Sequence, residues 1–302
     1  MRSASGSAID LGYARGESQA RELTASPEPD WLGACRRIAA GVEALLEATP
    51  STRERAVVVG EGAGGDRTLA IDQAAEELVF AELERLHALG ARFVAVSEER
   101  GEVDFGGGPV RVVIDPIDGS MNAKRGLAPY AVSIAVARGE TMADVVFGYV
   151  ADLSRGEEWR ATLGGGAWLG SERLVGPARE RRGRDGRLEL VCLESAYPAR
   201  LADRGAAVAA VAHRVRMLGS MALALCQLAA GRVDGMAALR RCRAVDVAAA
   251  QLIVRESGGL VAFTAFDEPL AAPLDVVPRS PIVAARTATA LAELATLPSS
   301  PE

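Results

Sequence analysis

Several acidic residues of this sequence stand where apolar runs begin or end. The acids are Glu98 and Glu99 after the run 94–96, Asp115 and Asp118 after the run 112–114, and Asp246 before the run 247–254. Carboxylates grouped at the mouth of a buried sheet repel one another, and each tends to keep a proton unless a cation is supplied. These short motifs contain no His, no Cys and no basic residue. Such a set of hard oxygen ligands predicts a site for Mg²⁺ or Mn²⁺ and not for Zn²⁺.

Each acid also has an ordinary structural interpretation. Asp246 could cap a helix, Asp118 could belong to a plain turn, and Glu98 could lie on a solvated loop. The combination is harder to explain in this way, because Pro116 and Gly119 restrict the backbone around the two aspartates of one compact turn.

The elements that must position these acids follow from hydrophobic periodicity. Apolar residues at spacings of three and four predict helices at 31–46, 72–89, 201–211, 220–229 and 246–256, with a closing helix from Thr287. Short β-branched runs between turn residues predict strands at 93–96, 110–114, 132–137, 145–150, 188–193, 215–218, 233–237, 260–263 and 282–284. Helices first, a strand-rich middle and then alternation predict stacked layers of helix and sheet.

Composition limits the class of protein. The chain has 302 residues, a net charge of −6 and a sequence pI of about 5.3, which disfavours nonspecific binding of nucleic acid. No apolar run reaches the roughly 18 residues of a membrane span, and residues 1–29 read as a flexible arm and not as a secretory signal. The four cysteines match no metal-binding spacing, so they predict buried, reduced thiols in a cytoplasmic protein.

Other catalytic classes find little support. The two histidines, His87 and His213, lie in or beside helical patterns, and the chain has no G-x-S-x-G motif for a hydrolase triad. The glycines at 60–62 and 164–166 do not complete a dinucleotide-binding fingerprint.

Several motifs resemble those of one known family, the inositol monophosphatases. Residues 115–120, Asp-Pro-Ile-Asp-Gly-Ser, look like its D-P-[IL]-D-G-[TS] signature, and 245–250 with 256–259 look like its second signature, D-x-A-A before E-[AS]-G-G. Residues 97–99, 60–72 and 164–167 resemble three further segments of the family. These segments occur in the family's order from Trp31 to Leu297, with most similarity to archaeal-type fructose-1,6-bisphosphatase/inositol-1-monophosphatases.

The resemblance implies an α+β and α/β fold, the layered αβαβα sandwich of the sugar phosphatases. A single phosphatase domain is then expected over residues 30–302, with subdomains of about 30–185 and 186–302. The implied activity is Mg²⁺-dependent hydrolysis of inositol monophosphate or a sugar phosphate such as fructose 1,6-bisphosphate. Two alternatives stay open: a 3′-phosphoadenosine-type nucleotide phosphatase, and a regulatory protein-binding homologue with little catalysis. The resemblance also implies a cytoplasmic homodimer that binds neither nucleic acid nor membrane.

The resemblance assigns roles to individual residues. Two or three Mg²⁺ ions, which Mn²⁺ can replace, are expected on Glu98, Asp115, Asp118, Asp246 and the carbonyl of Ile117, with Glu99 in an outer or third-metal position. Asp72 and Ser120 are expected to activate the attacking water. Gly119, Ser120 and Met121 are expected to hold the phosphate, and Tyr197 and Arg216 to contact the rest of the substrate.

Overall fold

The computed structural model describes residues 29–63, 67–176, 179–195 and 197–298. Nearly all of the predicted N-terminal arm, and Asp66 of the segment 60–72, lie outside these ranges. The helices described are α1 (Trp31–Ala48), α2 (Thr52–Arg55), α3 (Ala70–Ala88), α4 (Ser120–Arg125), α5 (Pro198–Val211), α6 (Met221–Ala229), α7 (Ala244–Glu256) and α8 (Ala288–Leu294), with a 3₁₀ turn at Met142–Asp144. None of the helices in these ranges is long and apolar enough to cross a membrane.

Most strands belong to two sheets. The larger sheet has the order β3-β4-β5-β6-β7-β8-β9, with β3 (Phe93–Ser97), β4 (Gly101–Asp118), β5 (Ala131–Ala137), β6 (Val145–Asp152), β7 (Glu157–Thr162), β8 (Gly166–Leu169) and β9 (Glu172–Leu174). The smaller sheet has the order β11-β10-β12-β14-β13, with β10 (Leu188–Glu194), β11 (Ala212–Arg216), β12 (Gly235–Ala238), β13 (Leu260–Phe263) and β14 (Ile282–Ala285). A separate pair, β1 (Val58–Glu61) and β2 (Arg67–Leu69), lies before α3.

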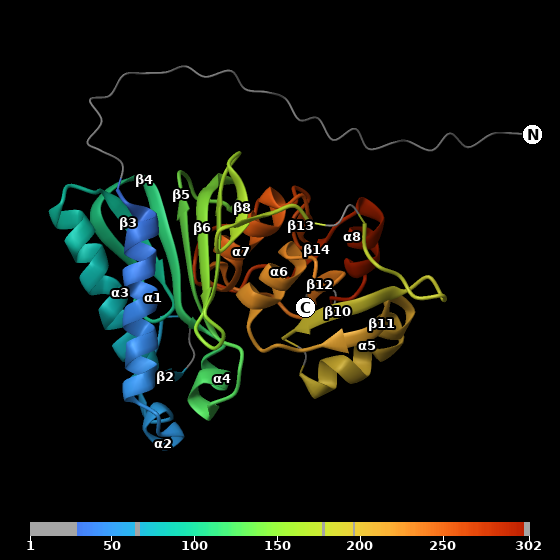
Figure 1. The fold of residues 1–302 in the computed structure, drawn as a ribbon, viewed down its shortest axis with the longest axis horizontal. Coiled ribbons are helices and arrows are strands. Elements are labelled where there is room, and N and C mark those ends of the chain that lie inside the picture. The colour runs from blue at the N-terminus through green and yellow to red at the C-terminus, as the bar shows by residue number, and fades with distance from the viewer. Residues whose placement is uncertain (1–28, 64–66, 177–178, 196, 299–302) are drawn as a thin grey trace, which may run out of the picture.

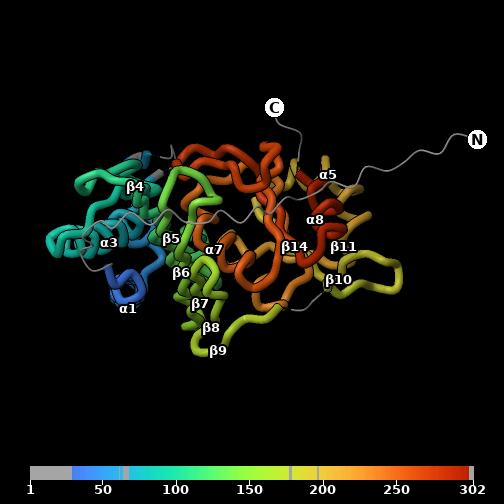
Figure 2. Tube along the Cα trace, turned by 90° about the horizontal axis from the view of Figure 1, so that it is seen from above, coloured from blue at the N-terminus to red at the C-terminus, as the bar shows by residue number. Residues whose placement is uncertain are grey.

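The elements stack in five layers, which Figures 1 and 2 show from two directions. Helices α1 and α3 pack on one face of the larger sheet, and α6 and α7 fill the space between the two sheets. Helices α5 and α8 cover the outer face of the smaller sheet. The predicted αβαβα sandwich is therefore confirmed.

Alternation along the strands explains this layering. In β5 the side chains of Val132 and Ile134 join the core under α1 and α3, whereas Ala131 and Ala135 join the core around α6 and α7. Successive side chains of a strand point to opposite faces, so a strand that is apolar at every position needs cover on both sides. Since all seven residues of β5 are buried, both faces of the sheet must carry helices.

Helix α7 is the most enclosed helix of the fold. Every residue from Ala244 to Val254 is buried, and the helix packs against α6, against strands of the larger sheet and against β13. It approaches β6 so closely that a Cβ added at Gly148 would lie 2.5 Å from the backbone oxygen of Ala249. Small residues at this contact let α7 lie close to β6. The first turn of α7 can then place Asp246 at the end of the larger sheet.

Strand β4 differs most from the prediction. It begins at Gly101 and not near Val110, and Ala95 of β3 pairs with both Val103 and Val112. The first part of β4 is rich in glycine and charge, so its strand structure comes from pairing with β3 and not from local propensity.

Candidate active site

The predicted acids meet at one end of the larger sheet, beside the start of α4, which lies at the lower end of the sheet in Figure 1. Glu98 and Glu99 follow directly after β3, and Asp115 and Asp118 belong to the last residues of β4. Asp246 comes from the first turn of α7, which reaches the same end from the other side. The structure thus brings together carboxylates from three elements.

Burial and mutual repulsion keep Glu98, Asp115 and Asp118 from ionising at their ordinary pH. Burial, followed by the charges of Glu98, Asp118 and Asp246, raises the pKa of Asp115 well above its usual value. Burial is also the main cause that raises the pKa of Asp118 to about 7. The pKa of Glu98 rises to about 8, chiefly by burial and against the opposing effect of Arg243. A divalent cation would remove this cost, because it stabilises the ionised forms.

The turn that carries the two aspartates of β4 is fixed by its own hydrogen bonds. The backbone N–H of Ile117 donates to Oδ1 of Asp115 at 2.9 Å. Oδ2 of Asp118 accepts from the Ser220 hydroxyl at 2.5 Å and from the Ala222 N–H at 2.8 Å. Asp118 therefore binds the N-terminal end of α6 and ties the larger sheet to the layer behind it.

One basic residue, Arg243, enters the cluster from outside the quoted motifs. Nη1 of Arg243 lies 2.7 Å from Oε1 of Glu98, and its Nη2 lies 3.1 Å from Oδ1 of Asp246. Arg243 stands just outside the quoted family motif. A run of three arginines at positions 240, 241 and 243, directly before Asp246, is the sequence signal that could have indicated it.

Asp72 lies in the first turn of α3 and Ser120 in the first turn of α4. Burial, then the charge of Glu99, raises the pKa of Asp72 to about 7, and Lys124 of α4 opposes this. Oδ1 of Asp72 is buried and has no hydrogen-bond partner among the described residues. A hydrogen bond between Asp72 and Ser120 is not found in the described structure, so the pairing of these two residues stays a prediction.

The start of α4 has the geometry expected of a phosphate site. Gly119 precedes the helix with a φ of 92°, a left-handed conformation that favours glycine. The N–H groups of Ser120 and Met121 lie in the first turn, where no earlier carbonyl of the helix can accept them. These N–H groups are available to an anion, although binding by them remains a prediction.

The two predicted substrate contacts lie near the surface. Tyr197 is 58% exposed and stands just before α5, with the guanidinium carbon of Arg240 4.9 Å from the centre of its ring. Arg216 ends β11, and its Nη1 donates to the carbonyl of Val215. Their roles stay predictions.

Two buried acids that support the site were missed from the sequence. Glu76 of α3 accepts hydrogen bonds from the Ser97 hydroxyl and the Arg100 N–H, so it fixes the turn that carries Glu98. Glu194 accepts from the N–H groups of Leu218 and Gly219 at 2.8 and 3.0 Å, and burial raises its pKa to about 7. Glu194 ends an apolar strand just as Asp115 does, and that signal was available.

The chemistry of the donor set fits a hard divalent cation. The cluster offers carboxylate oxygens with raised pKa values, and the Oδ1 atom of Asp72 lacks a partner in the described structure. Within the described residues, however, no three Asp, Glu, His or Cys side chains are already arranged around one common ion position. The predicted ligands Glu98, Asp115, Ile117, Asp118, Asp246 and Glu99 therefore stay a prediction.

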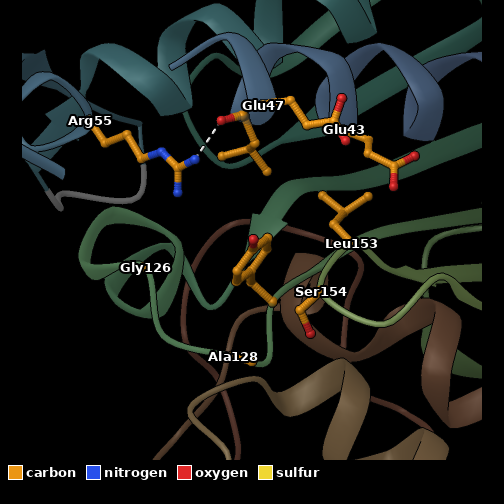
Figure 3. A pocket seen from close by; sticks show the side chains of 9 residues that line it. Glu43, Glu47, Arg55, Gly126, Ala128, Leu153 and Ser154 are labelled. Carbon is orange, nitrogen blue, oxygen red and sulfur yellow. Dashed lines mark hydrogen bonds between the residues drawn. The ribbon is translucent and has the colours of Figure 1, made fainter. Parts of the chain in front are cut away.

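Behind α4 lies a pocket of about 350 Å³, shown in Figure 3. Glu43 and Glu47 of α1, Tyr130 and Ser154 are among its lining residues. Arg55, at its edge, donates to the carbonyls of Leu46 and Thr49 at the end of α1 and to that of Ala123 in α4. None of the lining residues belongs to the carboxylate cluster. The hydrogen bond from Arg55 to Ala123 nevertheless helps to hold α4 in place.

The fold is a layered αβ sandwich with an acidic cluster at one end of its larger sheet, and comparisons with known proteins identify its family. The sequence profile of the inositol monophosphatase family matches residues 31–298. A fructose-1,6-bisphosphatase/inositol-1-monophosphatase of Methanothermobacter thermautotrophicus is 32% identical over 242 residues, covering 76% of this chain and 83% of that protein. The Nus factor SuhB of Escherichia coli is 33% identical over 214 residues, covering 68% and 75%.

Solved structures of the same family share the fold of this chain. A crystal structure of an inositol monophosphatase–fructose 1,6-bisphosphatase superposes with a TM-score of 0.73 at 25% identity, covering 89% of this chain and all 100% of the other. An inositol monophosphatase of Thermotoga maritima, 24% identical with a TM-score of 0.69, shares the fold, with 89% and 98% coverage. The chain belongs to the inositol monophosphatase family, a family of metal-dependent phosphatases. The prediction that it is a phosphatase enzyme is thereby confirmed.

Proposed function

We propose that this chain is a Mg²⁺-dependent phosphatase that hydrolyses the phosphate monoester of an inositol phosphate or of a sugar phosphate such as fructose 1,6-bisphosphate. The observation that carries the proposal is the meeting of Glu98, Asp115, Asp118 and Asp246 at the sheet end beside the first turn of α4. In this arrangement a cation held by the carboxylates would lie next to N–H groups that can bind a phosphate.

The proposed cation ligands are Glu98, Asp115, Asp118 and Asp246, with the carbonyl of Ile117, and Glu99 lies further out. Mg²⁺ bound there would neutralise charge on the phosphoryl oxygens and lower the pKa of an attacking water. Glu99 accepts a hydrogen bond from the Thr68 hydroxyl, which holds its carboxylate toward the segment before α3. The backbone N–H of Ala63 donates to the backbone oxygen of Glu99 at 2.9 Å.

The protein residues would orient the ester and move the proton. The N–H groups of Ser120 and Met121 would hold the phosphate at the start of α4. The Ser120 hydroxyl would orient the water, and Asp72 would accept its proton through the serine. A pKa of about 7 suits Asp72 to this role, because it can both take up and release a proton near neutral pH.

Arginine and aromatic groups would line the substrate side of the site. Tyr197 with Arg240, and Arg216 on β11, would contact the alcohol part of the ester. Both inositol and fructose phosphates present hydroxyl groups that such side chains can bind. We further propose that the enzyme is a cytoplasmic homodimer. The four cysteines are all buried and free, which suits a reducing compartment.

The test is hydrolysis of inositol 1-phosphate, fructose 1,6-bisphosphate and 3′-phosphoadenosine 5′-phosphate, each with Mg²⁺ and with EDTA. We expect release of phosphate from the first two esters, and only with Mg²⁺. Asp115→Asn should abolish most of the activity, whereas Asp267→Asn, at an exposed position after β13, should keep it. Selective hydrolysis of the nucleotide would favour the alternative substrate class.

The similarity to SuhB keeps a regulatory role as the second candidate. A protein that acts mainly by binding a partner would release no phosphate from any of the three esters under either condition. The retention of every predicted carboxylate favours catalysis.

A further inference from the structure

Arg243 joins two of the proposed metal ligands that come from different elements. Its Nη1 lies 2.7 Å from Glu98, which follows β3, and its Nη2 lies 3.1 Å from Asp246 in α7. Its backbone N–H also donates to Oδ2 of Asp246 at 3.0 Å. One arginine thus engages both oxygens of Asp246 and one oxygen of Glu98.

The guanidinium is well placed to stay in the cluster. The side chain of Arg243 is 17% exposed, similar to that of Glu98 at 18%. Burial disfavours its charge, but the nearby carboxylates of Asp246, Glu98 and Asp115 outweigh this and raise its pKa. Arginine keeps its positive charge at any ordinary pH, and its planar group can bridge two carboxylates.

A metal cation and a guanidinium compete for the same carboxylate oxygens and for the same negative charge. A metal ion held by Glu98 or by Asp246 would need lone pairs to which Arg243 now donates, and it would meet a fixed positive charge at close range. We propose that Arg243 takes the place of one divalent cation, so that the site binds one metal ion fewer than its carboxylates would otherwise hold. This inference rests on the proposed function, since it concerns the same metal site.

The experiment counts bound ions directly. The purified full chain is dialysed against increasing Mn²⁺, and the bound metal per chain is measured at saturation by elemental analysis. Electron paramagnetic resonance of free Mn²⁺ gives an independent count. We expect Arg243→Ala to bind one more Mn²⁺ per chain than the unchanged protein. Arg241→Ala, an exposed arginine two residues earlier, is the matched control and should keep the original count.

A second variant guards against loss of folding. Arg243→Gln keeps hydrogen-bonding groups near the carboxylates but removes the charge, and it should also gain one ion. Melting curves by circular dichroism establish that each variant is folded before ions are counted. Equal counts in the unchanged protein and in a folded Arg243 variant would overturn the inference.

The outcomes also separate this inference from the proposed function. If the unchanged protein binds Mn²⁺ and hydrolyses the esters but the Arg243 variants gain no ion, only the role of Arg243 is wrong. A raised KM together with an unchanged count would assign Arg243 to the substrate phosphate instead and would equally overturn the inference. If neither protein binds Mn²⁺ at millimolar concentration, the metal-dependent function itself fails.

Discussion

The carboxylates of the site differ in what holds each of them. Asp115 is fixed by a hydrogen bond within its own turn, Asp118 by the N-terminal end of α6, and Asp246 by Arg243. Removing a buried partner from a charged group costs more than removing an exposed one, because the remaining charge keeps its desolvation penalty. Substitutions at these three positions should therefore disturb different parts of the molecule.

We predict that Asp72 and Ser120 act as one unit on the attacking water. Asp72→Asn and Ser120→Ala should each lower kcat by about 10²- to 10⁴-fold, the usual range for a lost general base. The double variant should be little slower than the worse single variant, since residues that act together are not additive. The measurement is kcat for all four proteins at saturating Mg²⁺ and ester.

The control for this cycle is Glu84→Gln, an exposed acid on the same helix as Asp72. It should leave kcat unchanged. If the losses in the double variant multiply, the two residues act independently and the shared role is wrong.

We predict that in EDTA the free energy of unfolding falls as the pH rises from about 5 to about 8. Asp118 and Glu194 have pKa values of about 7 when folded, above the ordinary values near 4. Between these two pKa values the folded state keeps protons that the unfolded chain has already released. The stability that these groups contribute is therefore fully present below the unfolded pKa, and it is lost as the pH rises through the folded pKa. Each such proton contributes about 1.4 kcal/mol per pH unit.

Urea unfolding at several pH values measures this fall. Saturating Mg²⁺ should reduce it, because a cation favours the ionised carboxylates, and Glu194→Gln should make the fall shallower near pH 7. Surface acids such as Glu157 and Glu158, whose pKa values are lowered by arginines, change charge only in stronger acid and do not obscure the effect. Stability that rises over this range would contradict the prediction.

Residues of the site were predictable where chemistry and local sequence coincide. Asp115 and Asp118 stand in one short motif, and their position at a strand end follows from the apolar run before them. Arg243 was not predictable in the same way, since its partner Glu98 is distant in sequence and only the packing of α7 against the larger sheet brings them together.

Among the elements, α4 depends most on its neighbours. A helix of six residues is too short to be stable alone. Nδ2 of Asn122 donates to the carbonyls of Pro129 and Leu218, both at 2.8 Å, and Arg55 donates to the carbonyl of Ala123. These contacts hold α4 against α2, the segment before β5 and the segment before α6.

We predict that Asn122→Ala lowers both stability and kcat. The two carbonyls would lose their shared donor, at a cost of about 1–3 kcal/mol, and the start of α4 would be less well fixed against the phosphate. Urea unfolding and steady-state kinetics on the same protein give the two values. Gln73→Ala, which removes a side-chain hydrogen bond on the outside of α3, should change stability by less than about 0.5 kcal/mol. An Asn122 variant with the same stability and kcat as the unchanged protein would show that these two hydrogen bonds are unimportant.

Periodicity predicted the elements that bury a regular face and missed those formed by pairing. The helices near 31–46 and 246–256 and the strand at 132–137 are confirmed by α1, α7 and β5. The strands β7, β8 and β9 were not predicted, because none of them contains a β-branched run, so their structure depends on the neighbouring strands. Periodicity did not predict helix α4.

At the scale of the whole molecule, α7 and its contacts unite the two sheets. We predict that Gly148→Val lowers the free energy of unfolding by several kcal/mol, on the order of the cost of a severe core overpacking. The new Cβ would meet the backbone of Ala249, which cannot move without shifting the helix. The measurement is urea unfolding of the full chain.

Gly205→Ala is the matched control. Gly205 lies inside α5, and a Cβ added there would meet nothing within 4 Å. Replacement of a helical glycine by alanine should raise stability by about 0.5–1 kcal/mol. A Gly148 variant as stable as the unchanged protein would mean that α7 can move away from β6 at little cost.

The enclosure of α7 also determines how its amide protons exchange with solvent. An amide in a helix that is buried on all sides can reach water only when the surrounding layers separate, so its exchange follows the complete unfolding reaction. Amides of α4, held by a few side-chain contacts at the sheet end, can exchange through local opening. Deuterium uptake should thus be fast at the start of α4 and very slow along the buried middle of α7. The α4 side of the site would then open locally many times while the α7 side stays folded.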